Sequence, residues 1–150
     1  AWNHSPMKGA GVNIAMVATG TDNEHPGLVG KFVAGYDAVC YMHTDPTCVA
    51  AGLGARETDG SYVPDDGNQH GTACMGMAAA TGLDANGEQT GFEGSAQNAS
   101  LIDVRIGTDA GAGPFENYLI PQEFYESAMN GIQWIIDNTD TAWPGEDESQ

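Results

Sequence analysis

The sequence predicts an α/β domain with a largely parallel sheet. Strand-like and helix-like segments alternate along the 150 residues, as they do where helices connect parallel strands. Hydrophobic residues make up 41% of the chain, which is enough to build a core. Twenty-one glycines and seven prolines indicate many loops and argue against a helical bundle. The length predicts that residues 1–150 belong to one domain.

Three segments are predicted to be strands. Residues 12–18 form a short, nearly continuous apolar run, as in a strand that is buried on both faces of a parallel sheet. Residues 31–37 follow a His-Pro pair and are rich in strand-forming side chains. Residues 100–106 have the same character and precede a glycine-rich stretch, which favours the end of a strand there.

Two segments are predicted to be helices. Residues 70–81 carry small side chains at nearly every position, so this helix can pack closely against a sheet. A second helix is predicted from Pro121 to about Asn138, because proline suits the first helical position. In this helix, apolar residues that repeat every fourth position are expected to face the core; they are Phe124, Ala128, Ile132 and Ile136.

The remaining segments suggest that the domain is incomplete in this chain. Residues 38–69 show no periodicity and are interpreted as a long loop or a short hairpin region. The stretch 137–150 has five acidic residues and no basic one. A parallel sheet that stops after a helix leaves an open edge and a half-covered apolar helix face. We therefore expect more sequence, or another chain, to close the domain.

The charge of the chain excludes several partners. Twenty-one acidic residues against four basic ones give a net charge of −17, which repels nucleic-acid phosphates and anionic lipids. No apolar run approaches the roughly 20 residues of a membrane span, and the N-terminus lacks the apolar segment of a signal peptide. The sequence therefore predicts a soluble or already processed protein. High salt, bound divalent cations or a generally acidic proteome would each account for the charge.

The cysteines leave two interpretations open. Cys40 and Cys48 enclose an Asp-Pro turn, so they form either a small disulfide loop or two ordinary thiols. A disulfide would indicate an oxidising compartment outside the cytosol. Cys74 lies in a run rich in alanine and methionine and is interpreted as a small buried hydrophobic residue.

Nucleotide and metal motifs are weak. The glycines of Gly9-Ala10-Gly11 precede the first strand, whereas a dinucleotide-binding turn needs its glycines after the strand. The four histidines show no paired ligand spacing, so a zinc site is not predicted. Asp84 and Asn86 place oxygen ligands around a glycine turn, which is either a partial calcium loop or a plain turn.

Two ordered motifs resemble those of the subtilisin-like serine proteases, the subtilases. Residues 11–20, GVNIAMVATG, with His-Pro downstream, are similar to the family's strand that ends in V-x-D-T/S-G. Residues 68–76, NQHGTACMG, are similar to its H-G-T-x-x-A/M-G helix start. A third stretch, residues 99–106 followed by Gly111-Ala112-Gly113, is similar to the family's next strand and its substrate edge. The likeness covers most of the chain in the correct order.

The resemblance implies a three-layer fold with a mostly parallel central sheet, of which this chain is the N-terminal portion. It also implies peptide-bond hydrolysis with His70 as the general base. Ala18 stands at the position of the family's aspartate, and its side chain can neither accept a hydrogen bond nor balance an imidazolium. Asp22 is either a substitute for that aspartate or, as we favour, a surface or capping residue. No serine lies in the family's G-T-S context, so the nucleophile is expected in a missing segment or a partner chain.

Further roles follow from the same resemblance. Gly111, Ala112 and Gly113 would form an extended edge that pairs with the substrate backbone, with a simple glycine turn as the alternative. Structural calcium is expected in acidic loops such as those at Asp37, Asp65-Asp66 and Asp84 to Glu88. Gly27, however, stands where many family members carry a calcium-ligating aspartate.

Two functions are consistent with these observations. The first is a secreted, acidic, subtilisin-like serine endopeptidase acting on peptides or proteins, in which the remaining C-terminal half of the catalytic domain supplies the serine. The second is a catalytically inactive module of the same fold that binds peptides or builds an extracellular assembly, because Ala18 breaks the triad.

Overall fold

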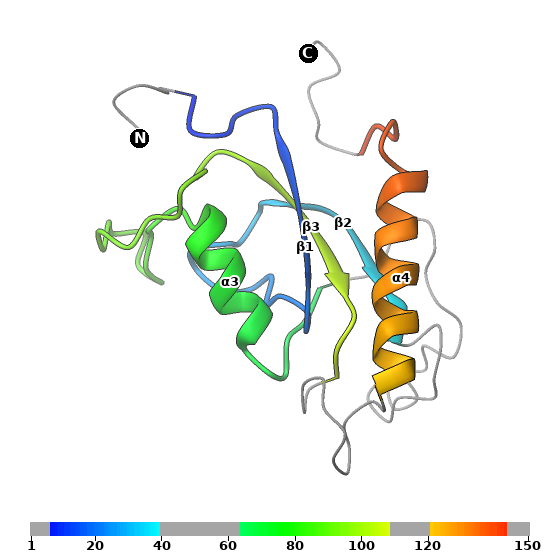
Figure 1. Ribbon diagram of the computed structural model, residues 1–150. Coiled ribbons are helices and arrows are strands. Elements are labelled where there is room, and N and C mark those ends of the chain that lie inside the picture. Colours follow the sequence, from blue (N-terminus) through cyan, green and yellow to red (C-terminus); the bar gives the residue numbers. More distant parts are fainter. Residues whose placement is uncertain (1–6, 40–63, 109–120, 144–150) are drawn as a thin grey trace.

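The computed structural model describes residues 7–39, 64–108 and 121–143 (Figure 1). Along the chain, these residues form strand β1 (Asn13–Ala18), strand β2 (Phe32–Asp37), helix α3 (His70–Ala79), strand β3 (Ser100–Arg105) and helix α4 (Pro121–Asp137). Each element lies within two residues of its predicted bounds, so the predicted alternation is confirmed. In the described ranges, no helix combines the length and hydropathy that crossing a bilayer requires.

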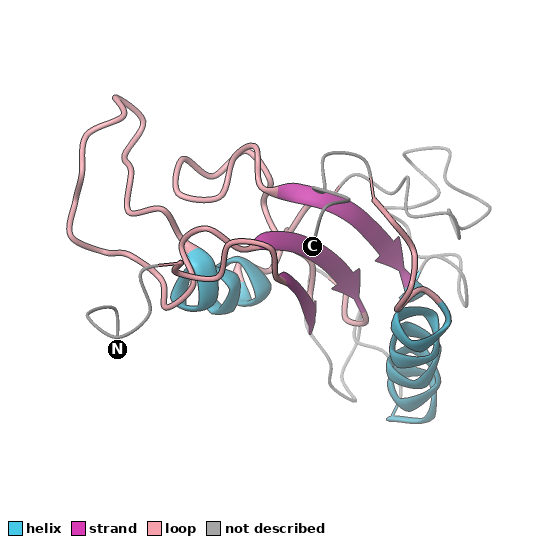
Figure 2. Cartoon of the chain, turned by 90° about the horizontal axis from the view of Figure 1, so that it is seen from above, coloured by secondary structure: helices cyan, strands magenta, loops and turns pink. Residues whose placement is uncertain are grey.

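The three strands form one parallel sheet in the order β1-β3-β2 (Figure 2). The predicted α/β class with a parallel sheet is therefore confirmed. Arg105 at the end of β3 is opposite Ala18 of β1 on one side and Asp37 of β2 on the other. Because the strands are parallel, their carboxyl ends meet at one edge of the sheet, which is where sites in α/β folds are usually built.

Helix α4 covers one face of this sheet and α3 the other (Figure 1). On the α4 side, Trp134 stacks on Tyr36 with 5.2 Å between ring centroids, and Trp143 stacks on Trp134 at 5.6 Å. These rings pack on Ile102 and Val104 of β3. The aromatic stack anchors α4 because large rings bury much apolar area and gain from stacking.

The predicted core-facing stripe of α4 is wrong in its second half. Phe124 and Ala128 pack against the core, but Ile132 and Ile136 are 50% and 59% exposed. A four-residue repeat overshoots one helical turn, so a row of such positions drifts by about 40° at each step and leaves the buried face. The fully or nearly fully buried positions of α4 follow a mixed spacing of three and four; they are Ser127, Gly131 and Trp134.

Helix α3 packs very closely on its face of the sheet, as its small residues predict. Met75 and Ala79 are fully buried against Leu101 of β3. The closest approach is at Gly71, where a Cβ atom would lie 1.8 Å from the carbonyl oxygen of Gly20 and 3.2 Å from the Ala18 Cβ. Only glycine allows this contact, which sets the start of α3 directly beside the end of β1.

Candidate active site

The start of α3 and the ends of β1 and β3 border a solvent-open pocket of roughly 360 Å³. His70, the first residue of α3, lines this pocket together with Ala18, the last residue of β1. The other lining residues come from the same strand ends, the loop before α3 and the start of α4; they are Val17, Thr19, Asn68, Ile106, Gly107 and Phe124. The structure thus brings together the two residues that the sequence motifs placed at the site.

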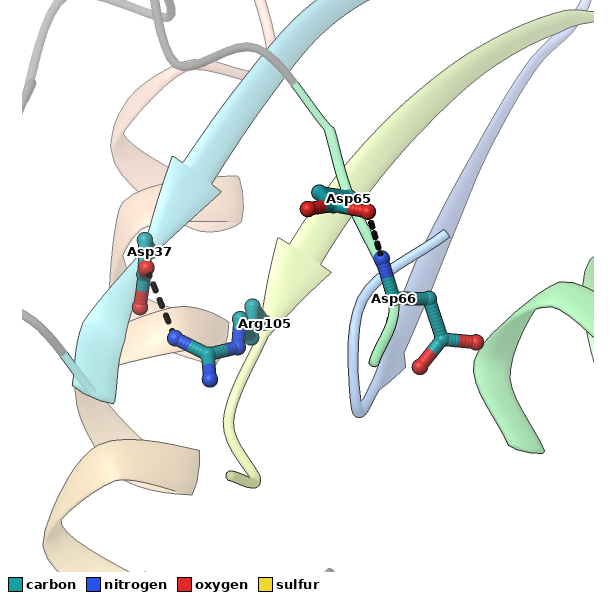
Figure 3. A network of polar contacts seen from close by, with 4 residues as sticks. All are labelled: Asp37, Asp65, Asp66 and Arg105. Atoms are coloured by element: carbon teal, nitrogen blue, oxygen red, sulfur yellow. Dashed lines mark hydrogen bonds and ion pairs between the residues drawn. The ribbon is translucent and has the colours of Figure 1, made fainter. Parts of the chain in front are cut away.

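A buried network ties the start of α3 to the end of β1. Asp66 Oδ1 accepts a hydrogen bond from Thr19 Oγ1 at 2.9 Å, and Asp66 Oδ2 accepts from Thr72 N at 2.9 Å and from Thr72 Oγ1 at 2.7 Å. Thr19 Oγ1 in turn accepts from the backbone N–H of Gly71 at 3.0 Å. The peptide groups on both sides of Gly71 are therefore held, one by the residue that follows β1 and the other by the loop before α3. Asp66 extends toward α3 in Figure 3.

Asp66 is held as a carboxylate by this network. Burial alone would raise its pKa, but the hydrogen bonds from Thr72 and Thr19 outweigh the burial and keep the pKa below its usual range. Asp66 was considered above as a possible calcium ligand, whereas in the structure its oxygens accept from the groups that begin α3. The sequence does carry a signal for this role: an aspartate lies a few residues before the His-Gly-Thr motif, where its side chain can accept hydrogen bonds from the first turn of the helix.

The residue before His70 cannot perform this capping. Gln69 is the N-cap of α3, yet its side chain makes no capping hydrogen bond and its backbone is left-handed, with φ of 73°. That conformation costs a non-glycine residue about 1–2 kcal/mol. Asp66, three residues before Gln69, supplies the missing hydrogen-bond acceptor. Gln69, the residue with the strained backbone, directly precedes His70.

The imidazole of His70 has one recorded polar contact within the described residues. Its Nε2 lies 3.6 Å from Sγ of Cys74, one helical turn later. The interpretation of Cys74 as a buried residue is wrong, since this thiol is partly exposed. The buried positions of α3 are Gly71, Met75 and Ala79, which face the sheet, so Cys74 lies to the side of that face.

Asp22 does not take the place of the aspartate that Ala18 replaces. Its Oδ1 accepts the backbone N–H of Glu24 at 2.9 Å, and its own N–H donates to Thr72 Oγ1 at 2.9 Å. Asp22 also lies outside the set of described residues that line the pocket. Its carboxylate closes a local turn, in agreement with the capping interpretation.

Two further buried acids lie on neighbouring strands at the same end of the sheet. Asp37 Oδ2 pairs with Arg105 Nη1 at 3.1 Å, and both side chains are buried (Figure 3). Asp103 is fully buried; its Oδ1 accepts from Thr21 Oγ1 at 3.0 Å, while its Oδ2 has no partner among the described residues. Burial raises the pKa of Asp103 well above its usual range, and the nearby carboxylates of Asp37 and Asp66 add to the rise.

Asp103 is expected to make the fold less stable as the pH rises. Because its pKa is higher in the folded state, its contribution is complete below the unfolded value near 3.9 and is lost as the pH climbs through the folded value. The variant Asp103→Asn removes the ionisation and keeps an acceptor for Thr21. Urea denaturation of both proteins should therefore show a stability difference that moves in favour of the variant between pH 4 and 8. A constant difference across that range would contradict the assignment.

The predicted calcium residues form a closed turn. Asp84 Oδ1 accepts the backbone N–H groups of Glu88 at 2.9 Å and Asn86 at 2.8 Å. These hydrogen bonds, led by that of Glu88, lower the pKa of Asp84. No cluster of three or more His, Cys, Asp or Glu side chains suited to a metal occurs in the parts of the chain that the structure describes. Calcium binding at Asp84 and Asn86 stays a prediction.

The remaining predicted site residues lie outside the described residues. These are the substrate edge at Gly111, Ala112 and Gly113 and the cysteine pair Cys40 and Cys48. The acidic stretch after Trp143 lies outside them as well. Their predicted roles therefore remain expectations.

The fold and the pocket define an α/β domain with a histidine at a helix start beside the carboxyl end of a parallel strand, β1. The model of the subtilase family matches residues 9–137, and the chain belongs to this family. The match spans β1, β2, α3, β3 and α4, so it includes both Ala18 and His70.

Several individual bacterial proteins are similar to this chain. Thermitase from Thermoactinomyces vulgaris is 35% identical over 137 residues, which cover 91% of this chain and 37% of thermitase. A thermophilic serine proteinase from a Bacillus species (strain AK1) is 36% identical over 69% of this chain and 20% of its own length. The major intracellular serine protease of Bacillus subtilis is 32% identical over 87% of this chain and 32% of its own length. The chain spans less than two fifths of each of these relatives.

Proposed function

We propose that the complete protein is a subtilisin-like serine endopeptidase to which this chain contributes the general base, His70. The observation that carries the proposal is the pocket that His70 shares with Ala18 at the carboxyl ends of β1 and β3. The relatives named as serine proteases support the same class of reaction. The nucleophilic serine and the oxyanion donors come from the C-terminal half of the catalytic domain, beyond this chain.

The chemistry assigns a step to each group. The imidazole of His70 takes the proton from the serine hydroxyl as that oxygen attacks the peptide carbonyl, and returns it to the leaving amine. In such triads a carboxylate holds the other ring nitrogen and stabilises the imidazolium. Ala18 offers no acceptor, so His70 acts with a weakened base function and turnover is low.

The exposed apolar side of α4 supports the proposal that a further segment of the catalytic domain packs against this helix. Tyr125, Met129, Ile132 and Ile136 are all at least half exposed and follow one another along the helix. Such a stripe of apolar side chains is uncommon on the solvent-exposed surface of a monomeric protein and is typical of an interface. We assign its cover to the C-terminal half of the same catalytic domain, which also supplies the serine.

The variant His70→Ala tests the role of His70. Hydrolysis of a chromogenic peptide by the complete protein should fall by roughly 70-fold. In subtilisin, loss of the aspartate alone lowers kcat by about 3 × 10⁴ and loss of the whole triad by about 2 × 10⁶, and the residual rate comes from the oxyanion donors and substrate binding. The variant His25→Ala is the control, since His25 is exposed in another part of the molecule and hydrogen-bonds the N–H of Gly27. Equal rates for wild type and His70→Ala would remove His70 from the mechanism.

A second function, an inactive peptide-binding module, is favoured by one observation, the alanine at position 18. A fluorophosphonate separates the two functions because it labels only an activated serine. Labelling of a serine in the companion segment would contradict the binding-only function. Absence of labelling together with peptide binding by the complete protein would support it.

We also propose an extracellular location and, by the family resemblance, a structural calcium ion. The relatives include a protease named as intracellular, so location rests on the acidic composition and the cysteine pair rather than on the family. A bound calcium ion would stabilise the folded state by mass action. Chelation should then lower the Tm of the complete protein, and added calcium should restore it.

A further inference from the structure

The pocket beside His70 ends at a methyl group. Ala18 occupies the last position of β1, and its side chain reaches no farther into the roughly 360 Å³ between the strand ends and His70. The polar side chains around that point have other partners: Thr19 Oγ1 donates to Asp66, and Asp22 Oδ1 accepts from Glu24. No described carboxylate lines the pocket.

We propose that this pocket binds a small monocarboxylate, with formate as the simplest case, and that the bound anion serves as acceptor and counter-charge for the His70 ring. An aspartate side chain differs from an alanine side chain by one carboxylate group, and formate is the smallest ion that carries this group. The expected effect on catalysis rests on the proposed function, whereas binding itself does not. The anion would make the rate of the enzyme depend on the concentration of carboxylate around it.

The lining of the pocket suits such an ion. Val17, Ile106 and Phe124 give the pocket apolar walls on one side, while His70 is exposed to solvent on the other; a charge-assisted hydrogen bond to its ring is stronger than a neutral one. Nε2 of the His70 ring contacts Cys74, so Nδ1 is the nitrogen left for the anion; it donates in the tautomer that carries the proton on Nδ1 and in the protonated ring. A carboxylate accepts from that N–H, fixes the tautomer and balances the imidazolium that forms when the serine proton is taken.

The rest of the molecule keeps the binding weak. The chain carries a net charge of −17, and the Asp66 carboxylate beneath the start of α3 repels a second anion. At about 0.1 M salt, charges beyond roughly 10 Å are largely screened, so the ring and the pocket walls dominate. The fraction of pockets that hold an anion should therefore rise with carboxylate concentration, and low concentrations should not saturate the pocket.

The test measures peptide hydrolysis by the complete protein in sodium formate, with sodium chloride keeping the ionic strength constant. Formate should raise the rate saturably by at least about tenfold, a gain that corresponds to a small part of what a covalent carboxylate gives. The variant Ala18→Leu places apolar atoms where the anion would lie and should not respond. Ala18→Asp carries its own carboxylate and should be active without formate and unresponsive to it.

A second measurement follows binding without turnover. In the complete protein, the NMR signals of the His70 ring should move saturably with formate, and should stay unchanged in Ala18→Leu. If neither the hydrolysis rate nor the NMR signals of the His70 ring change with formate while Ala18→Asp is active, the proposed anion site is contradicted. The proposed protease function is then unaffected. If Ala18→Asp is inactive, the protease function is wrong, and the ring signals alone decide whether the anion binds.

Discussion

Ala18→Asp is expected to raise the turnover of the complete protein by several orders of magnitude. Loss of the corresponding aspartate in subtilisin lowers kcat by about 3 × 10⁴, which sets the upper limit of the gain. The physical reason is that a carboxylate at the end of β1 lies in the same pocket as His70, where it orients the ring and stabilises the imidazolium. Because these interactions act in the transition state, kcat should rise while KM stays nearly constant.

Ala18→Asn is the matched control for this gain. The amide has nearly the same size as the carboxylate, but it carries no charge and can present a donor to the ring, which favours the wrong tautomer. Its turnover should therefore stay within a small factor of the wild-type value. Equal gains from asparagine and aspartate would show that filling the pocket, rather than charge, is responsible.

Gly71→Ala is expected to destabilise the protein by about 3 kcal/mol or more. The added Cβ would lie 1.8 Å from the carbonyl oxygen of Gly20, a backbone atom that cannot rotate away. Ordinary overpacking costs about 1–3 kcal/mol, and here β1 and α3 must separate. This separation would also strain the hydrogen bond from Gly71 N to Thr19 Oγ1. Urea denaturation of the complete protein measures the loss.

Gly76→Ala, in the same helix, is the control for Gly71→Ala. A Cβ at Gly76 meets no atom within 4 Å, so the substitution should be neutral or stabilise by up to about 1 kcal/mol through helix propensity. If both variants lose the same stability, helix composition rather than the close contact with β1 would be the cause.

The sequence predicted the elements because their local signals agree with their environment. The apolar run of β1 and the small residues of α3 leave few alternatives to a buried strand and a close-packed helix. For α4 the local signal was ambiguous, since its apolar residues exceed what one face can bury. Only the packing of Trp134 between Tyr36 and Trp143 decided which of them face the core.

The sequence by itself determined that a histidine opens a helix, that alanine stands where the related strand carries an acid, and that the strands are parallel. Tertiary structure alone decided which residues far apart in the chain surround them: Thr19 donates to Asp66, Asp103 is buried beside Thr21, and Arg105 pairs with Asp37. The physical reason is the strand order, which inserts β3 between β1 and β2. Residues far apart in the chain are thereby brought together at the carboxyl ends of the strands, and local sequence patterns do not predict which of these side chains come into contact.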